Sequence, residues 1–244
     1  MRPPSWPLIA MASAALAVSL TACAPRPGHI QVRDPELRAF LDRRLDKFES
    51  VNRPFGAAIA SLLIKTNSPR IMEEDEYPRR PGPAPLMTVR AAGVTVREIV
   101  EEVIQKDGRC APFEENGFLV LAPPHIYHDP RNSLNFIVDE AAVENGSPLA
   151  ILNPINAKLK ANGLKQISLN TDTVGGLEED MTLRARGKTV RWILIEMAKQ
   201  RGVEIGINIT NDHVVFATGS RFKARHLLNY FDESVDLPFG LKKK

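Results

Sequence analysis

The stretch Met-Thr-Val-Arg-Ala-Ala-Gly at residues 87–93 returns as Met-Thr-Leu-Arg-Ala-Arg-Gly at residues 181–187, which is 94 residues later. In both copies apolar residues alternate with polar ones, the period of a strand that buries one face. Both copies continue through Thr-Val-Arg into a stretch with helical spacing of apolar residues, and each such stretch ends at a glycine, Gly108 or Gly202. The chain therefore carries one strand, turn and helix unit twice.

The repeat extends on both sides of this unit. Downstream, Phe118–Ala122 matches His213–Ala217. Upstream, helices are predicted at Phe55–Ile64 and Pro148–Ala161, and further strands are predicted at Arg70–Met72, Gln166–Leu169 and Ser133–Val138. The complete unit reads strand, helix, strand, strand, helix, strand, strand, so the predicted fold class is α+β with two tandem small modules.

Composition limits the classes of function. The 244 residues are 43% hydrophobic and 25% charged, as in a globular protein, and the formal net charge is only +3. Nucleic-acid binding needs clustered basic charge, so a nucleic-acid partner is not expected. Two cysteines cannot form a disulfide framework.

The first residues have the pattern of a secretory signal. Arg2 precedes an uncharged apolar run from Trp6 to Leu20, and this run ends in Leu-Thr-Ala-Cys at residues 20–23. That ending resembles a bacterial lipobox, which implies that Cys23 becomes the lipidated first residue. A plain cleaved signal with an accidental cysteine and a short membrane helix are the alternatives. Ala24 follows the cysteine, so the predicted location is the outer membrane, with the protein facing the periplasm.

These features divide the chain into five segments. They are the signal peptide 1–22, the lipidated cysteine with a tether and lead-in 23–50, a first module 51–124 with a proline-rich insertion at 78–85, a second module 133–218, and an apolar C-terminal segment with a lysine tail 219–244.

The second copy, from Ala150 to Thr218, resembles the short N-terminal domain of secretins and TonB-dependent receptors, also called the secretin N0 or STN domain. The order of elements around Met181–Val190 carries the resemblance, and the first copy looks like a diverged member. The resemblance implies protein contacts in the periplasm, without catalysis or a cofactor. Nothing after Ala217 resembles a secretin channel or a receptor barrel. The predicted function is therefore a periplasmic adaptor or assembly factor for a secretin-like or other outer-membrane complex.

Comparing the two repeat helices suggests where a protein partner binds. Glu98 and Glu101 of the first copy align with Trp192 and Ile195 of the second. An exposed apolar pair of this kind needs a cover. Either the first copy or the C-terminal segment packs there, or Trp192 anchors a partner.

The C-terminal segment is too apolar for a simple disordered tail. It carries Phe231 and Phe239, which we expect to dock either on the second module or on a partner. A homo-oligomer is a further option.

Two other functions compete with the adaptor. His125, His128 and Asp129 are side-chain types that bind zinc, so an envelope hydrolase or metal-dependent enzyme is an alternative, although the flanking prolines favour an interdomain loop. The other alternative is a structural lipoprotein that binds the cell wall.

Cys110 is expected to be a half-buried thiol, and the acidic run at residues 73–76 is expected to be a solvated loop.

Overall fold

The computed structural model describes residues 30–68, 70–76, 85–169, 180–201, 204–209 and 213–219. Cys23, the tether and the C-terminal segment with Phe231 and Phe239 lie outside these ranges. The described chain is a mixed α+β protein.

The described residues form six helices. They are α1 (Pro35–Leu41), α2 (Phe55–Thr66), α3 (Val96–Asp107), α4 (Pro124–Tyr127), α5 (Pro148–Ala161) and α6 (Val190–Arg201), with a 3₁₀ turn at Ser133–Asn135. Four of the six, α2, α3, α5 and α6, follow the sequence pattern, while α1 lies in the predicted lead-in and α4 lies where an interdomain loop was expected. Thr95 and Glu98 form the predicted capping box at the start of α3, and Gly108 ends this helix with a left-handed φ of 68°.

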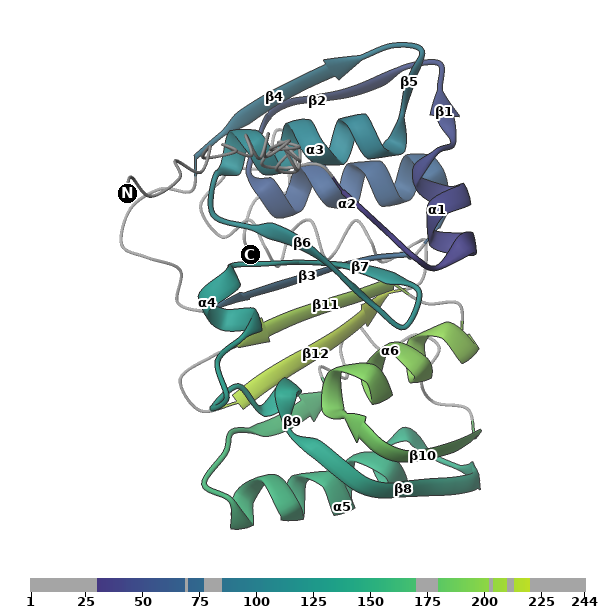
Figure 1. The fold of residues 1–244 in the computed structure, drawn as a ribbon, viewed down its shortest axis with the longest axis vertical. Coiled ribbons are helices and arrows are strands. Elements are labelled where there is room, and N and C mark those ends of the chain that lie inside the picture. Colours follow the sequence, from purple (N-terminus) through teal and green to yellow (C-terminus); the bar gives the residue numbers. More distant parts are fainter. Residues whose placement is uncertain are drawn as a thin grey trace, which may run out of the picture.

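Twelve strands are described, and six of them form one continuous sheet. The strands are β1 (Arg44–Leu45), β2 (Phe48–Arg53), β3 (Ile71–Glu76), β4 (Met87–Ala91), β5 (Val94–Thr95), β6 (Ala111–Glu115), β7 (Phe118–Ala122), β8 (Ile137–Gly146), β9 (Gln166–Leu169), β10 (Met181–Thr189), β11 (Glu204–Ile209) and β12 (His213–Gly219). The order in the long sheet is β6-β7-β3-β11-β12-β9. These strands run across the middle of Figure 1.

The long sheet joins the two halves of the chain. β6, β7 and β3 belong to the first half, and β11, β12 and β9 belong to the second. The joint is a parallel pairing of β3 with β11, in which Glu73 lies opposite Gly206 and Glu76 opposite Ile209. The halves therefore share main-chain hydrogen bonds as well as side-chain contacts.

Two antiparallel ribbons lie apart from the long sheet, at the top and the bottom of Figure 1. One pairs β2 with β4, and the other pairs β8 with β10. β8 begins at Ile137, so the leading strand of the second half is longer and later than the predicted 133–138. The sequence strand, helix, strand, strand, helix, strand, strand occurs once from β2 to β7, with the short β5 added, and again from β8 to β12.

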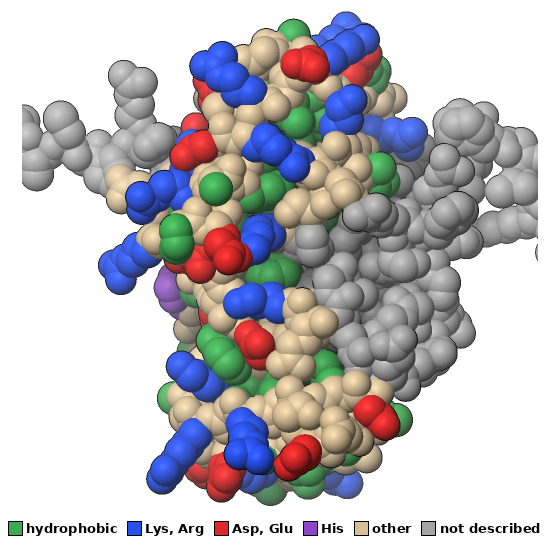
Figure 2. All heavy atoms as spheres, turned by 90° about the vertical axis from the view of Figure 1, so that its right-hand side faces the viewer, with side chains coloured by type: hydrophobic (Ala, Val, Ile, Leu, Met, Phe, Trp, Pro, Cys, Tyr) green, Lys and Arg blue, Asp and Glu red, His purple; other side chains and the backbone are tan. Residues whose placement is uncertain are grey.

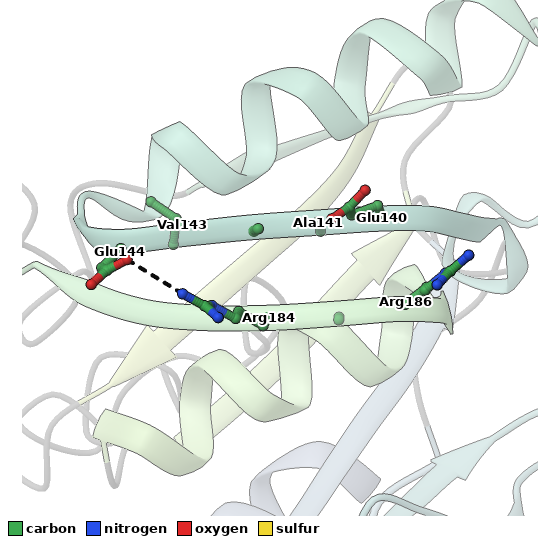
Figure 3. Close-up of a pocket in the computed structure, with 8 residues that line it drawn as sticks. Glu140, Ala141, Val143, Glu144, Arg184 and Arg186 are labelled. Atoms are coloured by element: carbon green, nitrogen blue, oxygen red, sulfur yellow. Dashed lines mark hydrogen bonds and ion pairs between the residues drawn. The ribbon is translucent and has the colours of Figure 1, made fainter.

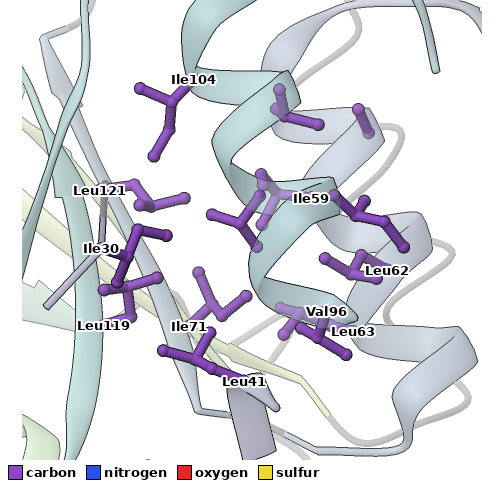
Figure 4. Packing of buried hydrophobic residues seen from close by; sticks show 14 of the residues in the cluster. Ile30, Leu41, Ile59, Leu62, Leu63, Ile71, Val96, Ile104, Leu119 and Leu121 are labelled. Atoms are coloured by element: carbon purple, nitrogen blue, oxygen red, sulfur yellow. The ribbon is translucent and has the colours of Figure 1, made fainter. Parts of the chain in front are cut away.

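The two halves have separate apolar cores, and β7 contributes to both. Its alternate residues Leu119 and Leu121 face the first core, with α2 and α3, while Phe118 and Val120 face the second. Figure 4 shows Leu119 and Leu121 beside Ile30 and Ile71 in the first core. Ile30 is only 1% exposed and belongs to the first core, so the folded part of the first half begins at least 21 residues before the predicted boundary at residue 51.

The prediction of a solvated loop at residues 73–76 is wrong. These residues form most of β3, which lies inside the long sheet. Glu74 has a relative exposure of 0%. A buried carboxylate is costly unless it is paired and hydrogen-bonded, so the structure must supply partners for it.

Candidate protein-contact surfaces and a buried polar network

The partner of Glu74 comes from the other half of the chain. Arg191, in the first turn of α6, is 1% exposed. Its Nε and Nη2 donate to the two carboxylate oxygens of Glu74 at 2.9 and 3.0 Å. Two parallel bonds between a guanidinium and a carboxylate are the strongest and most directional form of ion pair.

Other side chains complete this buried polar network. Arg191 also donates to Asn135 at 2.7 Å and to Glu115 at 3.4 Å, and its guanidinium carbon lies 4.3 Å from the centre of the Tyr127 ring. Asn132 donates to Glu74 at 2.7 Å. The network thus gathers side chains from β3, β6, α6 and the segment that links the two halves.

Burial and charge shift the ionisation of this network. Burial alone lowers the pKa of Arg191, but the bonds and negative charge of Glu74 outweigh it, so the pKa is raised and the guanidinium stays charged. Burial, followed by the negative charge of Glu115, raises the pKa of Tyr127 to about 12. Tyr127 is therefore neutral at physiological pH, and its hydroxyl donates to Glu115 at 3.3 Å.

The sequence contained a signal for this network. Arg191 is the repeat counterpart of Arg97, which donates to Asp42 at 2.8 Å, just as Arg191 donates to Asn135. A backbone hydrogen bond beside these arginines is also repeated. The N–H of Val96 donates to the carbonyl oxygen of Arg43, and the N–H of Val190 donates to that of Phe136, both at 3.0 Å. The pairing with Glu74 is the added feature in the second half, and the network fixes how the two halves meet.

The helix face proposed for partner binding is turned towards the first half. Ile195 is 0% exposed and lies in the second core, with Phe118 and Val120 of β7. The next residue, Glu196, accepts from the Asn116 amide in the turn between β6 and β7, and Lys199, one helical turn after Ile195, donates to the same amide. Ile195 is therefore unavailable to a partner.

Trp192 remains half-buried at the rim of this contact. It packs against the second core, and the Lys188 ammonium lies 5.1 Å from the centre of its ring. Of the two predicted anchor residues on α6, only Trp192 keeps part of its surface accessible.

The histidine cluster does not converge. His125 is exposed on α4, and His128 makes edge-on contacts with Phe113 and Tyr127 at 5.3 and 5.1 Å. The Asp129 carboxylate accepts from the backbone and side chain of Arg131, which lowers its pKa. Among the described residues no group of three or more His, Cys, Asp and Glu side chains is arranged to hold a metal ion. Cys110 is buried in the first core, rather than half-buried.

The outer face of the β8–β10 ribbon is an accessible surface of the second half. We call Glu140, Ala142, Glu144, Arg184 and Arg186 the ribbon surface; all five are exposed. They line a shallow hollow of about 500 Å³ (Figure 3). Arg184 and Glu144 make a 3.4 Å ion pair with 76% and 71% of their side chains exposed, so little energy holds them together.

The β2–β4 ribbon offers a second, smaller hollow. It has a volume of about 410 Å³ and lies between β2 and α2, where Ile64 is 44% exposed. Arg90 donates to Glu49 at 3.0 Å across this ribbon, and that bond lowers the pKa of Glu49. Both hollows thus combine charged and apolar side chains, and both are shallow.

Acidic and basic side chains alternate on the described part of the face in Figure 2, without a large field of one sign. No helix within the described ranges is both long and apolar enough to span a bilayer.

Comparison with protein-family models, with curated proteins and with solved structures gave no match.

Proposed function

We propose that this chain is a non-catalytic envelope lipoprotein that acts as a periplasmic protein adaptor or assembly factor. In this proposal Cys23 carries the lipid anchor at the outer membrane, and two modules similar to the secretin N0 domain make the protein contacts. The partner is a secretin-like or other outer-membrane complex. The repeated element order supports this assignment, because the segments from β2 to β7 and from β8 to β12 each contribute a two-stranded ribbon, two helices and three strands of the long sheet.

The observation that carries the proposal is the exposure of the β8–β10 ribbon. Its strands run over 10 and 9 residues, and each is paired only with the other among the described strands. Strand edges of this length present unpaired N–H and C=O groups that a partner strand can take up. On the adjoining face Arg184 is 76% exposed, and arginine is one of the residue types enriched at protein interfaces.

The anchor geometry agrees with a protein held close to the membrane. Residues 24–29 separate Cys23 from Ile30, the first described residue, which is buried in the first core. Cys23 and Ile30 are seven residues apart, so the chain between them spans at most about 25 Å when extended. The folded body would therefore stay within about one domain diameter of the bilayer.

The test is affinity purification of the intact lipoprotein from its own membrane. Ala142→Arg places a long cation in the centre of the ribbon surface, and Ala161→Arg does the same at an exposed site on α5. The proposal predicts one or more envelope proteins that co-purify with the wild type and with Ala161→Arg but not with Ala142→Arg. Equal recovery with both variants would reject the ribbon surface as the contact, and no protein partner at all would reject the adaptor.

A further inference from the structure

The two ends of the long sheet differ from the joint at its centre. At the joint, β3 continues past β7 and pairs with β11. At the ends, β6 and β9 have no further strand beside them among the described residues. An edge of this kind is open to unwanted pairing unless something closes it.

One side chain of α5 takes both backbone groups of a residue in the middle of β9, and Ser133 Oγ donates to the carbonyl oxygen of Lys165 just before this strand. Asn156 Nδ2 donates to the carbonyl oxygen of Ile167 at 2.8 Å, and the backbone N–H of Ile167 donates to Asn156 Oδ1 at 2.7 Å. A side-chain amide has both a donor and an acceptor, so it reproduces the pair of bonds that a neighbouring strand would make. Since Asn156 takes both backbone groups of Ile167, they point away from β12 and towards the free edge.

The repeat supplies the comparison. The buried residues Phe55, Ile59 and Leu63 of α2 correspond to Ile151, Ile155 and Leu159 of α5, each 96 residues later. Ile71 of β3 corresponds to Ile167 of β9, again 96 residues later. The strand pairings agree, because Ile71 lies opposite Leu119 of β7 and Ile167 lies opposite Val214 of β12, the repeat counterpart of β7. The counterpart of Asn156 is therefore Ala60, a buried residue without a polar side chain.

The difference between Ala60 and Asn156 follows the difference between the two edges. Where α2 carries Ala60, the adjacent strand β3 continues into a pairing with β11. Where α5 carries Asn156, the adjacent strand β9 ends the described sheet. An asparagine in a helix interior is unfavourable by itself, so its two bonds to Ile167 account for its place in α5.

The opposite end of the sheet is blocked by other means. Pro112 in β6 lies opposite Leu121 of β7 and has no N–H to offer on the outer side. The Glu114 carboxylate accepts from the N–H groups of Arg33 and Asp34 at 2.5 and 2.7 Å, which ties the lead-in segment to β6. A copy of this chain therefore has no suitable β6 edge to place beside β9.

We propose that Asn156 is an edge-closing residue that prevents a second copy of this chain from pairing through β9. Without its amide, the β9 strands of two copies pair with each other across a two-fold axis. Such a contact needs only β9, and it closes at a dimer. This role is independent of the partner contact proposed above.

The test compares the full chain in detergent with Asn156→Ala, the residue that its counterpart has. Molecular mass is measured by sedimentation over a range of concentrations, and exchange of the Ile167 amide is followed in parallel. We expect wild type to keep one mass and Asn156→Ala to shift towards two copies as concentration rises. At low concentration the Ile167 amide of the variant should exchange about fivefold faster, since about 1 kcal/mol of hydrogen bonding is lost.

Asn162→Ala is the matched control, because the exposed Asn162 amide donates to the carbonyl oxygen of Lys158 in α5 and not to β9. It should behave like wild type. Asn156→Ser is too short to bridge both groups of Ile167, and it serves if the alanine variant does not fold. The proposal is overturned if a folded Asn156 variant keeps the wild-type mass at every concentration, or if its Ile167 amide stays as protected as in wild type.

Discussion

At the scale of single residues, the pair Arg191 and Glu74 determines how the halves fit together. A buried ion pair contributes little net stability compared with apolar residues, but the loss of one partner leaves a buried charge without compensation. Here both members are fully covered, and their partners Asn132 and Asn135 come from the segment between the halves. The pair therefore links β3 of the first half to α6 of the second, and neither member can be removed without leaving a buried charge.

Arg191→Met should lower the free energy of unfolding by about 3 to 5 kcal/mol, because Glu74 remains buried and unpaired. The double variant with Glu74→Gln should recover a large part of this loss. Urea unfolding followed by circular dichroism measures both values. Arg184→Ala, at an exposed pair, is the control and should cost under about 1 kcal/mol. A single variant no less stable than this control would contradict the buried pairing.

Tyr127 gives the network a signature at high pH. Its pKa is about 12 in the folded protein, against 10.0 ordinarily, so the unfolded chain loses this proton first as pH rises. Stability from this group is complete below pH 10 and falls between about pH 10 and 12, because the unfolded state then binds fewer protons. Tyrosinate absorbance at 295 nm should show a late step that Tyr127→Phe removes. Ionisation of Tyr127 near pH 10 would contradict its burial beside Glu115.

At the scale of elements, local patterns were sufficient for most helices. Ile151, Leu152, Ile155 and Leu159 form one apolar stripe, and α5 has the predicted limits Pro148–Ala161. The strand β9 likewise has its predicted limits. Such elements are encoded by residues three or four positions apart, so the sequence contains the whole signal.

The acidic strand could not be predicted in this way. Glu74 is stable inside the sheet only because Arg191, 117 residues away, meets it there. No local pattern reports a partner at that distance. For the same reason, the alignment of Trp192 and Ile195 with two glutamates showed that this helix face needs a cover, but not that β7 and the turn after β6 provide it.

The capping box of α3 can be tested as an element. Thr95→Ala removes the hydroxyl that accepts from the N–H of Glu98 at 3.2 Å, and it should cost about 1 kcal/mol of stability. Glu102→Gln, in an exposed pair with Lys106 of the same helix, should change little. Thermal unfolding separates the two variants. Equal stability of Thr95→Ala and wild type would show that the cap is not formed in solution.

At the scale of the whole molecule, one sheet through both halves makes the protein a single body with a ribbon at each end. Pro112 and Asn156 close the ends of that sheet, while the β8–β10 ribbon remains exposed. The repeat was visible in the sequence, and two modules were predicted from it. The sequence did not show that the strands of the two modules join in one sheet, because β3 and β11 are brought together only by the packing of the two halves.

The central claim is that this exposed ribbon contacts another envelope protein. The most direct measurement is crosslinking in the native cell envelope from a photoreactive residue at position 142, compared with the same residue at position 157 on the exposed side of α5. We predict an adduct of fixed mass with another protein from position 142 and none from position 157. The claim would be contradicted if position 142 gave no protein adduct in cells that contain the folded protein.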